Sequence, residues 1–374
     1  MSPFAHITGW GMAAPEHVMT NTELEKIVET SDEWIRSRTG IRERRIASDE
    51  QTSASLAVEA AQRALRVARL NPADLDLIIV STSSPEHIFP ATACLVQDRL
   101  GAVKAGAFDL SAACTGFIFA LNIAAQSIRT GSSRNALVIG AETLSRFVDW
   151  KDRNTCILFG DGAGAFVLQA GEEEAGVLSS VMRSDGSGGD LLSVPGGGSR
   201  FPATKETIDK GLHFIHMNGR EVFRFATRVM VQATEEAVAK AGMKLEDINW
   251  VIPHQANLRI IEAAMRGLKL PMDQCVVNLD RYGNTSTASI PIAACEAIQD
   301  GRIKPGDRLV LVGFGAGLTC GAVTVIWSGP FAGAKRVLPV RFRWYARFRS
   351  LVNRLLRRLD ALIWGRRNPY RSEE

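Results

Sequence analysis

Short apolar runs alternate with helical segments along most of this 374-residue chain. The runs are rich in Val, Ile and Leu, which is typical of strands that are covered on both faces. The segments between them, such as residues 52–70 and 220–242, carry apolar residues at helical spacing. This alternation predicts a layered α/β protein with buried sheets. The expected strands are residues 75–82, 136–142, 163–169, 249–255 and 308–315.

Two pairs of segments resemble each other across the chain. Residues 64–82 and 237–255 each combine a helix, an acidic loop and a strand, with Asp76 of the first aligned with Asn249 of the second. Residues 127–142 and 297–315 each combine a helix that ends at a glycine with a strand that runs to another glycine. Two similar halves packed as one unit would place their equivalent loops around a shared site. The expected division is residues 1–175, 176–330 and a tail, residues 331–374.

The second pair of segments also suggests which loops are equivalent. In this pair, Gly131 of the first half is aligned with Gly301 of the second. The same alignment places Cys114 in the first half opposite Asn284 in the second half.

Composition favours the cytoplasm and a large core. The chain has 46% hydrophobic residues and six cysteines, without a close pair such as CxxC. This cysteine usage argues against a disulfide framework or a zinc site and favours a reducing compartment. The first residues lack the pattern of a secretory signal peptide, and no apolar run reaches the length of about eighteen residues that a membrane span needs.

The tail differs from the rest of the chain in charge. Residues 331–374 contain 12 Lys and Arg against three acidic residues, so the tail carries +9 and residues 1–330 carry −5. From Val340 to Trp364, apolar residues recur at steps of three and four, which predicts an amphipathic helix. A basic amphipathic helix with Trp and Phe is typical of a membrane-surface anchor. The alternatives are a partner-binding helix, a nucleic-acid-binding arm, or a helix folded back on the protein's own surface.

Cys114 lies in the segment DLSAACTGFIFAL, where an expected strand meets an expected helix. A helix N-terminus offers unpaired N–H groups and the positive end of the dipole, which favour a thiolate and therefore a nucleophile. The alternative is a small core residue, because free cysteines are among the most buried residue types. Cys320 follows a glycine-rich turn and is ambiguous. The other cysteines, for which we expect core positions, are Cys94, Cys156, Cys275 and Cys295.

Three further loops carry groups that a cysteine nucleophile needs. His254 follows an expected strand in WVIPHQANLRI, and Asn284 lies in the turn RYGNTSTAS. Residues 313–322, GFGAGLTCGA, could direct backbone N–H groups at an oxyanion. Each feature also has a structural interpretation, as a strand-end histidine, a helix cap or a tight glycine turn. Together they place Cys, His, Asn and a glycine-rich turn at strand ends in both halves.

From about residue 4 to 328 the chain resembles β-ketoacyl-[acyl-carrier-protein] synthase III, a condensing enzyme that starts bacterial fatty-acid synthesis. The resemblance implies the thiolase fold, a duplicated five-layered αβαβα arrangement, and a homodimer. It rests on residues 30–46, 89–101, 109–117, 157–168, 251–263 and 281–291, taken together in this order.

The resemblance implies a catalytic triad of Cys114, His254 and Asn284. Cys114 would take an acyl group from an acyl-CoA, and malonyl-[acyl-carrier-protein] would lose CO2 and attack the acyl-enzyme to give 3-oxoacyl-[acyl-carrier-protein]. The histidine and asparagine would donate hydrogen bonds to the enolate oxygen, and the N–H groups of Cys114 and Ala316 would form the oxyanion hole. No metal or redox cofactor is implied, only CoA and the carrier's phosphopantetheine as substrate carriers.

The resemblance also implies contacts with CoA and the acyl carrier protein. Trp34 and Arg38 match a pair that holds the CoA adenine, and Arg153 matches a third residue there. Phe89 matches a residue that reaches across a dimer to the partner's acyl pocket. The arginines that match a docking surface for the acidic carrier protein are Arg224, Arg259 and Arg266.

Two positions depart from the family pattern. Arg220 stands where well-known members carry asparagine, and Cys320 stands where many carry tryptophan. Degradative thiolases use a second catalytic cysteine and a histidine at the place of Asn284, so the asparagine favours the decarboxylating branch. We expect Cys320 to serve in packing. The alternatives to a priming synthase are a specialised synthase of secondary metabolism with another starter or acceptor, and a non-catalytic scaffold.

Overall fold

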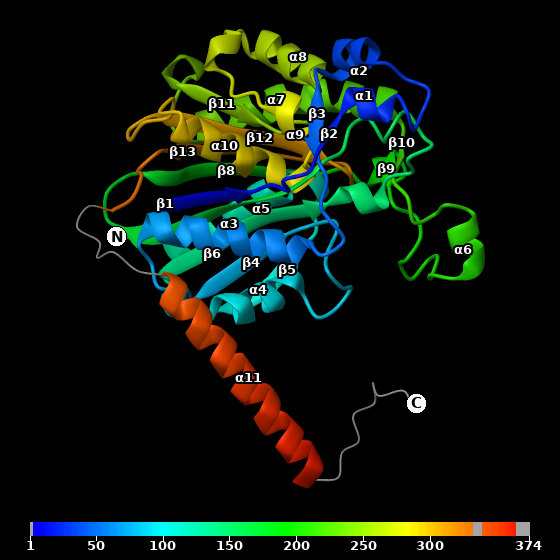
Figure 1. Cartoon of the computed structure of the whole chain (residues 1–374). Coiled ribbons are helices and arrows are strands. Elements are labelled where there is room, and N and C mark those ends of the chain that lie inside the picture. Colours follow the sequence, from blue (N-terminus) through cyan, green and yellow to red (C-terminus); the bar gives the residue numbers. More distant parts are fainter. Residues whose placement is uncertain (1–2, 332–338, 364–374) are drawn as a thin grey trace.

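The computed structural model describes residues 3–331 and 339–363 (Figure 1). The expected alternation is present: each predicted strand and both predicted long helices form, with ends that shift by a few residues. The body has two sheets. The first sheet has five strands, in the spatial order β1 (Phe4–Ala13), β7 (Asp161–Gly171), β6 (Asn135–Thr143), β4 (Leu77–Ser81) and β5 (Gly106–Leu110).

The second sheet has four strands and repeats the pattern of the first. One of its central strands, β12 (Arg308–Gly315), has a parallel neighbour on one side and an antiparallel neighbour on the other, as β6 does in the first sheet. At the place of β5 it has only an isolated parallel bridge between Val251 and Cys275. Its spatial order is β11 (Trp250–Pro253), β12 (Arg308–Gly315), β13 (Thr319–Ile326) and β8 (Gly176–Ser184).

Helices complete five layers, as the sequence predicted. Two helices lie between the sheets, and one pair covers the outer face of each sheet (Figure 1). The central pair is mostly apolar because both of its sides are covered. The central helices are α5 (Gly116–Arg129) and α10 (Ser289–Gln299); the outer ones are α3 (Ser53–Ala68) with α4 (Thr92–Leu100), and α7 (Gly219–Lys240) with α8 (Leu258–Leu268).

Short elements surround one end of the layers. Among them, α2 (Asp32–Thr39) contacts α8, and β2 and β3 form a small antiparallel pair. The remaining bounds are β2 (Val18–Thr20), β3 (Glu43–Arg45), β9 (Leu192–Ser193), β10 (His216–Met217), α1 (Asn21–Leu24), α6 (Lys205–Asp209) and α9 (Leu279–Tyr282).

One glycine allows the two halves to meet. Gly140 in β6 lies against the backbone of the second half, where an added Cβ would come within 2.5 Å of the Thr287 carbonyl oxygen. Any larger residue would push the halves apart, because that neighbour is backbone and cannot rotate away. The close approach brings the loops of both halves to one place.

The alignment of Gly131 with Gly301, and with it the pairing of Cys114 with Asn284, is wrong. The first residue of α5, Gly116, is equivalent to the first residue of α10, Ser289, so the structure places Thr287 at the position equivalent to Cys114. The error arose because α5 has 14 residues and α10 has 11, and the glycines after the two helices are therefore not equivalent.

The other alignment, of residues 64–82 with 237–255, agrees with the structure. It matches Leu77, where β4 begins, with Trp250, where β11 begins. Continued along the chain, the same alignment matches Gly116 with Ser289, so one register relates the strands and the central helices of the two halves.

The expectation of a core position is also wrong for Cys94. Cys156, Cys275 and Cys295 are buried, but Cys94 is exposed on α4. The helix covers β4 and β5 at the open edge of the first sheet, so only part of its surface is covered. An apolar periodic segment therefore does not bury each of its small residues.

The predicted tail helix is present as α11 (Pro339–Ile363) and contacts α4 and α3. It extends away from the layered body (Figure 1). Trp364 and the tail residues 332–338 and 365–374 lie outside the described residues. Among the described residues, no helix is long and apolar enough to cross a membrane.

Candidate active site

Cys114 lies where the sequence predicted, between a strand and a helix. It is the middle residue of a short 3-10 turn, η2 (Ala113–Thr115), which joins the end of β5 to the start of α5. Ala113 has a φ of 46°, a conformation that is costly for a residue with a side chain. A strained backbone conformation persists only where the surrounding structure holds it in place, and such positions cluster at functional sites. Cys114 itself is only 6% exposed.

Burial acts against the thiolate form of Cys114 that the sequence led us to expect. Burial raises the pKa of the Cys114 thiol to about 12, although hydrogen bonding to Ser286 acts in the opposite direction. The nearby carboxyl of Glu142 raises this pKa further. Loss of water disfavours any buried charge, so burial acts against the thiolate. The nucleophile stands as a neutral thiol before substrate binds.

His254 follows β11 directly and is buried. Its Nδ1 lies 2.7 Å from the Ser289 hydroxyl, which also accepts the backbone N–H of Gln255 at 3.4 Å. Since that hydroxyl accepts from the backbone, it is free to donate its own hydrogen to Nδ1. We assign the ring hydrogen to Nε2 on this basis. Burial lowers the pKa of His254 to about 3, so the ring is neutral at physiological pH.

Asn284 is fixed by contacts on both its backbone and its side chain. Its N–H donates to the Leu158 carbonyl at 2.8 Å, and its carbonyl accepts from Gly160 at 3.0 Å. Its side-chain Oδ1 accepts the backbone N–H of Ser286 at 2.8 Å. Because the oxygen of the amide is occupied, the amide nitrogen is the group left to donate. Asn284 thus offers a hydrogen-bond donor in the second half.

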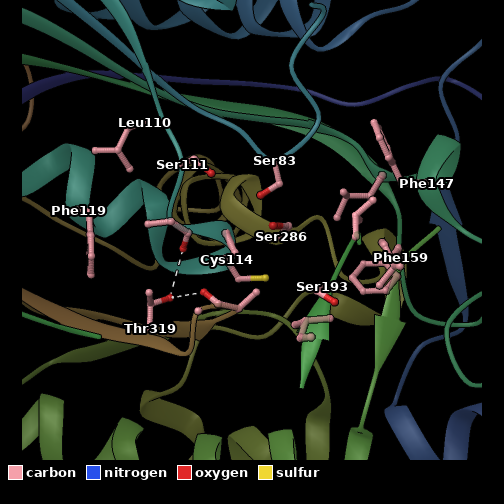
Figure 2. A pocket seen from close by; sticks show the side chains of 18 of the residues that line it. Ser83, Leu110, Ser111, Cys114, Phe119, Phe147, Phe159, Ser193, Ser286 and Thr319 are labelled. Atoms are coloured by element: carbon pink, nitrogen blue, oxygen red, sulfur yellow. Dashed lines mark hydrogen bonds between the residues drawn. The ribbon is translucent and has the colours of Figure 1, made fainter. Parts of the chain in front are cut away.

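The glycine-rich turn passes close to the cysteine backbone. An added Cβ on Gly315 would come within 2.8 Å of the Cys114 nitrogen, so only glycine allows this approach. The next residue, Ala316, borders the same cavity as Cys114. Thr319 steadies the turn, since its hydroxyl lies within hydrogen-bond distance of the carbonyl oxygens of Ala112 (3.3 Å) and Ala316 (3.1 Å), which share its single hydrogen (Figure 2).

Two cavities meet at Cys114. The larger one, of about 530 Å³, is mostly apolar, and the Cys114 sulfur points into it with Ser286 and Ser193 nearby (Figure 2). The smaller one, of about 200 Å³, is bordered by Cys114, His254 and Asn284. The predicted triad is therefore gathered around one space. Apolar residues that line the larger cavity are Leu110, Phe119, Leu144, Phe147, Phe159, Leu192, Val194 and Ile215.

The smaller cavity leads from the triad to the predicted CoA residues. Trp34 and Arg38, both on α2, border it together with the triad. The Arg153 guanidinium lies over the Trp34 ring, 5.2 Å from its centroid. A partly buried indole ring with a guanidinium on one face can also stack on a planar, electron-rich group. Trp34 and Arg38 therefore border the cavity of the triad, and Arg153 joins them through its contact with the Trp34 ring.

The three predicted docking arginines lie on α7 and α8. Arg224 is 67% exposed and pairs with Glu221 at 2.9 Å, whereas Arg266 is 72% exposed and lies 4.0 Å from Glu262. Arg259 lies over the Phe223 ring, which borders the smaller cavity. The arginines thus follow the two helices beside the cavity. Arg220 is also exposed, in the first turn of α7, and borders neither cavity.

Two other predicted residues lie apart from the triad. Phe89 is 81% exposed and borders neither cavity of the single chain, so its reach into a partner's pocket stays a prediction. Cys320 is buried in β13 within the core that α7 and α8 cover, and it also borders neither cavity. Its position agrees with the packing role that we expected.

Three residues of the site were missed in the sequence. Ser289 orients His254, Ser286 lies beside Cys114, and Glu142 is a fully buried carboxyl at the end of β6. Burial raises the pKa of Glu142 to about 7, while hydrogen bonds from Ser84 and Ser83 oppose the rise. The signal for Ser286 and Ser289 was the polar run TSTAS ahead of a buried helix. An acidic residue at the end of an apolar strand was the signal for Glu142.

Comparison with known proteins agrees with this geometry. Residues 108–186 match the family model 3-Oxoacyl-[acyl-carrier-protein (ACP)] synthase III, and residues 238–327 match the model of its C terminal. The chain is 56% identical over 324 residues to a β-ketoacyl-[acyl-carrier-protein] synthase III from Caldanaerobacter subterraneus subsp. tengcongensis, covering 87% of this chain and 98% of the relative.

Solved structures share the fold over the same part of the chain. The crystal structure of 3-oxoacyl-[acyl-carrier-protein] synthase III from Aquifex aeolicus superposes with a TM-score of 0.80 at 49% identity, covering 86% of this chain and 100% of that one. The priming β-ketosynthase from the R1128 polyketide pathway superposes with a TM-score of 0.82 at 35% identity, covering 88% and 98%. The chain therefore belongs to the β-ketoacyl-[acyl-carrier-protein] synthase III family, acyltransferases of thiolase-like fold, and is a condensing enzyme that initiates fatty-acid synthesis.

Proposed function

We propose that Cys114 carries the acyl group in a decarboxylative Claisen condensation between an acyl-CoA and malonyl-[acyl-carrier-protein]. The observation that carries this proposal is the place of the cysteine where the two cavities meet. The narrower cavity, which Trp34 and Arg38 also border, fits a pantetheine arm that enters from the surface. The larger apolar cavity fits the acyl chain once it is bound to sulfur.

In the first half-reaction the Cys114 sulfur attacks the thioester carbonyl of acyl-CoA. The thiol proton passes to the departing CoA sulfur, so an acyl-enzyme and free CoA thiol result. Because the thiol is neutral in this structure, we propose that it loses its proton as the new carbon–sulfur bond forms. Backbone N–H groups of Cys114 and Ala316 stabilise the oxyanion of the tetrahedral intermediate.

In the second half-reaction the malonyl group loses CO2, and the resulting enolate attacks the acyl-enzyme carbonyl. The Cys114 thiolate leaves and takes a proton from solvent. His254 donates from Nε2 and Asn284 donates from its amide nitrogen to the enolate oxygen, which is the role their hydrogen bonds leave open. A histidine with a pKa of about 3 acts here as a neutral donor.

Surface groups extend this proposal to the partners. Trp34, Arg38 and Arg153 hold the adenine end of CoA by stacking, while Arg224, Arg259 and Arg266 steer the acidic carrier protein. Such charges act mainly on the rate of encounter. We also propose that the enzyme is a cytoplasmic homodimer whose tail contacts the inner face of the membrane, with exposed Phe89 reaching the partner's acyl cavity.

Mass spectrometry of the intact protein after mixing with acyl-CoA tests the acyl-enzyme. We expect one acyl adduct, on the peptide that contains Cys114, and its transfer to carbon when malonyl-[acyl-carrier-protein] is added. A protein that forms no adduct with any starter would contradict the proposal. The starters should include acetyl-CoA and longer or branched acyl-CoAs, because the cavity of about 530 Å³ leaves the chain length open.

A specialised synthase of secondary metabolism remains the second candidate. The fold likeness to the R1128 priming synthase favours it, although the identity to fatty-acid relatives is higher. An adduct that forms with an unusual starter and condenses only poorly with malonyl-[acyl-carrier-protein] would support this candidate over the first.

A further inference from the structure

The helix α11 attaches to the body through its polar side. The Ser350 hydroxyl donates to the Asp98 carboxylate of α4 at 2.9 Å, and Ser350 is 8% exposed. The Arg354 guanidinium lies 3.8 Å from the same carboxylate. Since both groups lie on one side of α11, they hold that side against α4 and turn the opposite side outward.

The outward side of α11 is apolar. Spacings of three and four residues place its large apolar side chains in one stripe, away from Ser350. Trp344 and Phe348 stack within the stripe, with ring centroids 5.6 Å apart. The exposed members, each 45% to 70% accessible, are Trp344, Tyr345, Phe348, Leu351, Leu355, Leu356 and Leu359.

This orientation is the reverse of that of an ordinary surface helix. A helix that folds back on its own protein buries its apolar stripe and exposes its polar side. Here the polar side makes the contact, so the described part of the chain does not cover the stripe. A nucleic-acid-binding arm would need basic side chains for the phosphates but no wide apolar stripe. The family model ends at residue 327, so the helix is an addition to the shared catalytic fold.

Charge indicates what covers the stripe. The helix sequence contains seven arginines and a single acidic residue, Asp360. Arginines beside an aromatic and leucine stripe suit the surface of an anionic bilayer, where the stripe enters the headgroup boundary and the guanidinium groups meet lipid phosphates. The helix is too charged to span the bilayer, in agreement with the absence of a spanning helix among the described residues.

We infer that α11 binds an anionic lipid surface through the stripe Trp344–Phe348–Leu351–Leu355–Leu359, while its contact with Asp98 keeps the enzyme attached in one orientation. This inference deepens the membrane contact proposed above and rests on it, but not on the proposed chemistry. Figure 1 shows α2 and α8, which border the smaller cavity, on the side of the body opposite to α11. A bound enzyme therefore keeps its CoA entrance open to the cytoplasm.

Co-sedimentation of the full chain with vesicles tests this inference. We expect binding to vesicles of phosphatidylcholine mixed with phosphatidylglycerol, and little binding to phosphatidylcholine alone. The variant Leu351→Gln/Leu355→Gln keeps the charge of the helix but removes apolar area from the stripe. Its affinity for the vesicles should therefore fall by about tenfold or more. Arg349→Gln/Arg358→Gln, which changes one arginine at each edge of the stripe, should bind about tenfold more weakly and lose the preference for anionic lipid.

A matched control is Asn353→Gln, an exposed polar residue of the same helix, which should bind as the unchanged chain does. Condensing activity should be equal in all four proteins, with and without vesicles, so a failure of binding is distinct from a failure of the proposed function. Equal sedimentation of the leucine variant and the unchanged chain would overturn the inference. The inference would also be overturned if the unchanged chain did not sediment with vesicles and the leucine variant had a different oligomeric state. The stripe would then bind a second copy of the chain.

Discussion

The two strand-to-helix junctions at the centre of the molecule share a backbone shape and differ in chemistry. In the first half, η2 precedes α5; in the second, η7 (Ser286–Ala288) precedes α10, and the two turns contact each other. Each begins with a residue of positive φ, 46° at Ala113 and 50° at Ser286. The first carries a thiol and the second carries hydroxyl groups, with Asn284 just before it.

The difference shows how a duplicated fold can divide one reaction between its halves. The repeated backbone brings equivalent turns together, and side chains at each turn then specialise. In the mechanism that we propose, the first half holds the group that forms a covalent bond, and the second half supplies neutral hydrogen-bond donors for a developing charge. If this division is correct, the two half-reactions should be separable by single substitutions.

The largest effect is expected at the first junction. Cys114→Ala should abolish the acyl adduct and reduce condensation by about 10⁴-fold or more, since no other described group can replace the nucleophile. The same variant should still release CO2 from malonyl-[acyl-carrier-protein], because His254 and Asn284 remain. Mass spectrometry measures the adduct, and release of labelled CO2 measures the second step. Loss of both activities in a folded variant would break the comparison.

A smaller and opposite pattern is expected in the second half. His254→Ala and Asn284→Ala should each keep acylation within a few-fold and reduce decarboxylation by about 10² to 10³-fold, the usual cost of losing one donor to an oxyanion. Single-turnover assays of each half-reaction give the two rates separately. Equal loss of acylation and decarboxylation would show that these residues also act in the first step.

The protonation state of the nucleophile can be measured in the free enzyme. Because burial raises the pKa of Cys114 to about 12, its alkylation by iodoacetamide should rise about a hundredfold between pH 8 and 10. A thiol of ordinary pKa would rise about fourfold over this range and level off. Peptide mapping distinguishes Cys114 from exposed Cys94. If the alkylation rate of Cys114 reached a plateau near pH 9 or below, the N-terminus of the helix would lower the thiol pKa more than burial raises it.

The mildest change concerns a positioning residue. Ser289→Ala should reduce decarboxylation about tenfold, because His254 then loses the partner that keeps its hydrogen on Nε2. Acylation should be unchanged, and Ser289→Thr should restore most of the rate by supplying a hydroxyl. If acylation and thermal stability fall together with decarboxylation, Ser289 acts by packing the site and does not act by orienting His254.

Much of the fold could be predicted because local patterns carry it. Apolar runs such as residues 75–82 and 308–315 form strands, and the residues 52–70 and 220–242 form the outer helices. The register between the two halves was harder to predict from the sequence. Because α10 is shorter than α5, the alignment of the glycines after the two helices was displaced, and Cys114 was paired with Asn284 when its structural equivalent is Thr287. The length of a central helix depends on how it packs between the two sheets, and local sequence patterns do not predict that packing.

The site could be predicted in part for a related reason. Cys114, His254 and Asn284 stand at strand and helix ends, where residue type and element boundary are both visible in the sequence. Ser289 and Glu142 act through contacts with residues distant in the chain, so only their partners explain them. The state of the thiol also differed from expectation, because desolvation depends on what surrounds a group in space.

By itself, the sequence determined the alternation of strands and helices, the family, the residue types of the triad and the amphipathic tail. These depend on spacing along the chain, which is local information. Only the tertiary structure decided that the two cavities meet at Cys114, that Cys94 is exposed, and that α11 turns its apolar stripe outward. Burial, enclosed space and the direction of a face are properties of surfaces brought together, and they exist only once the chain has folded.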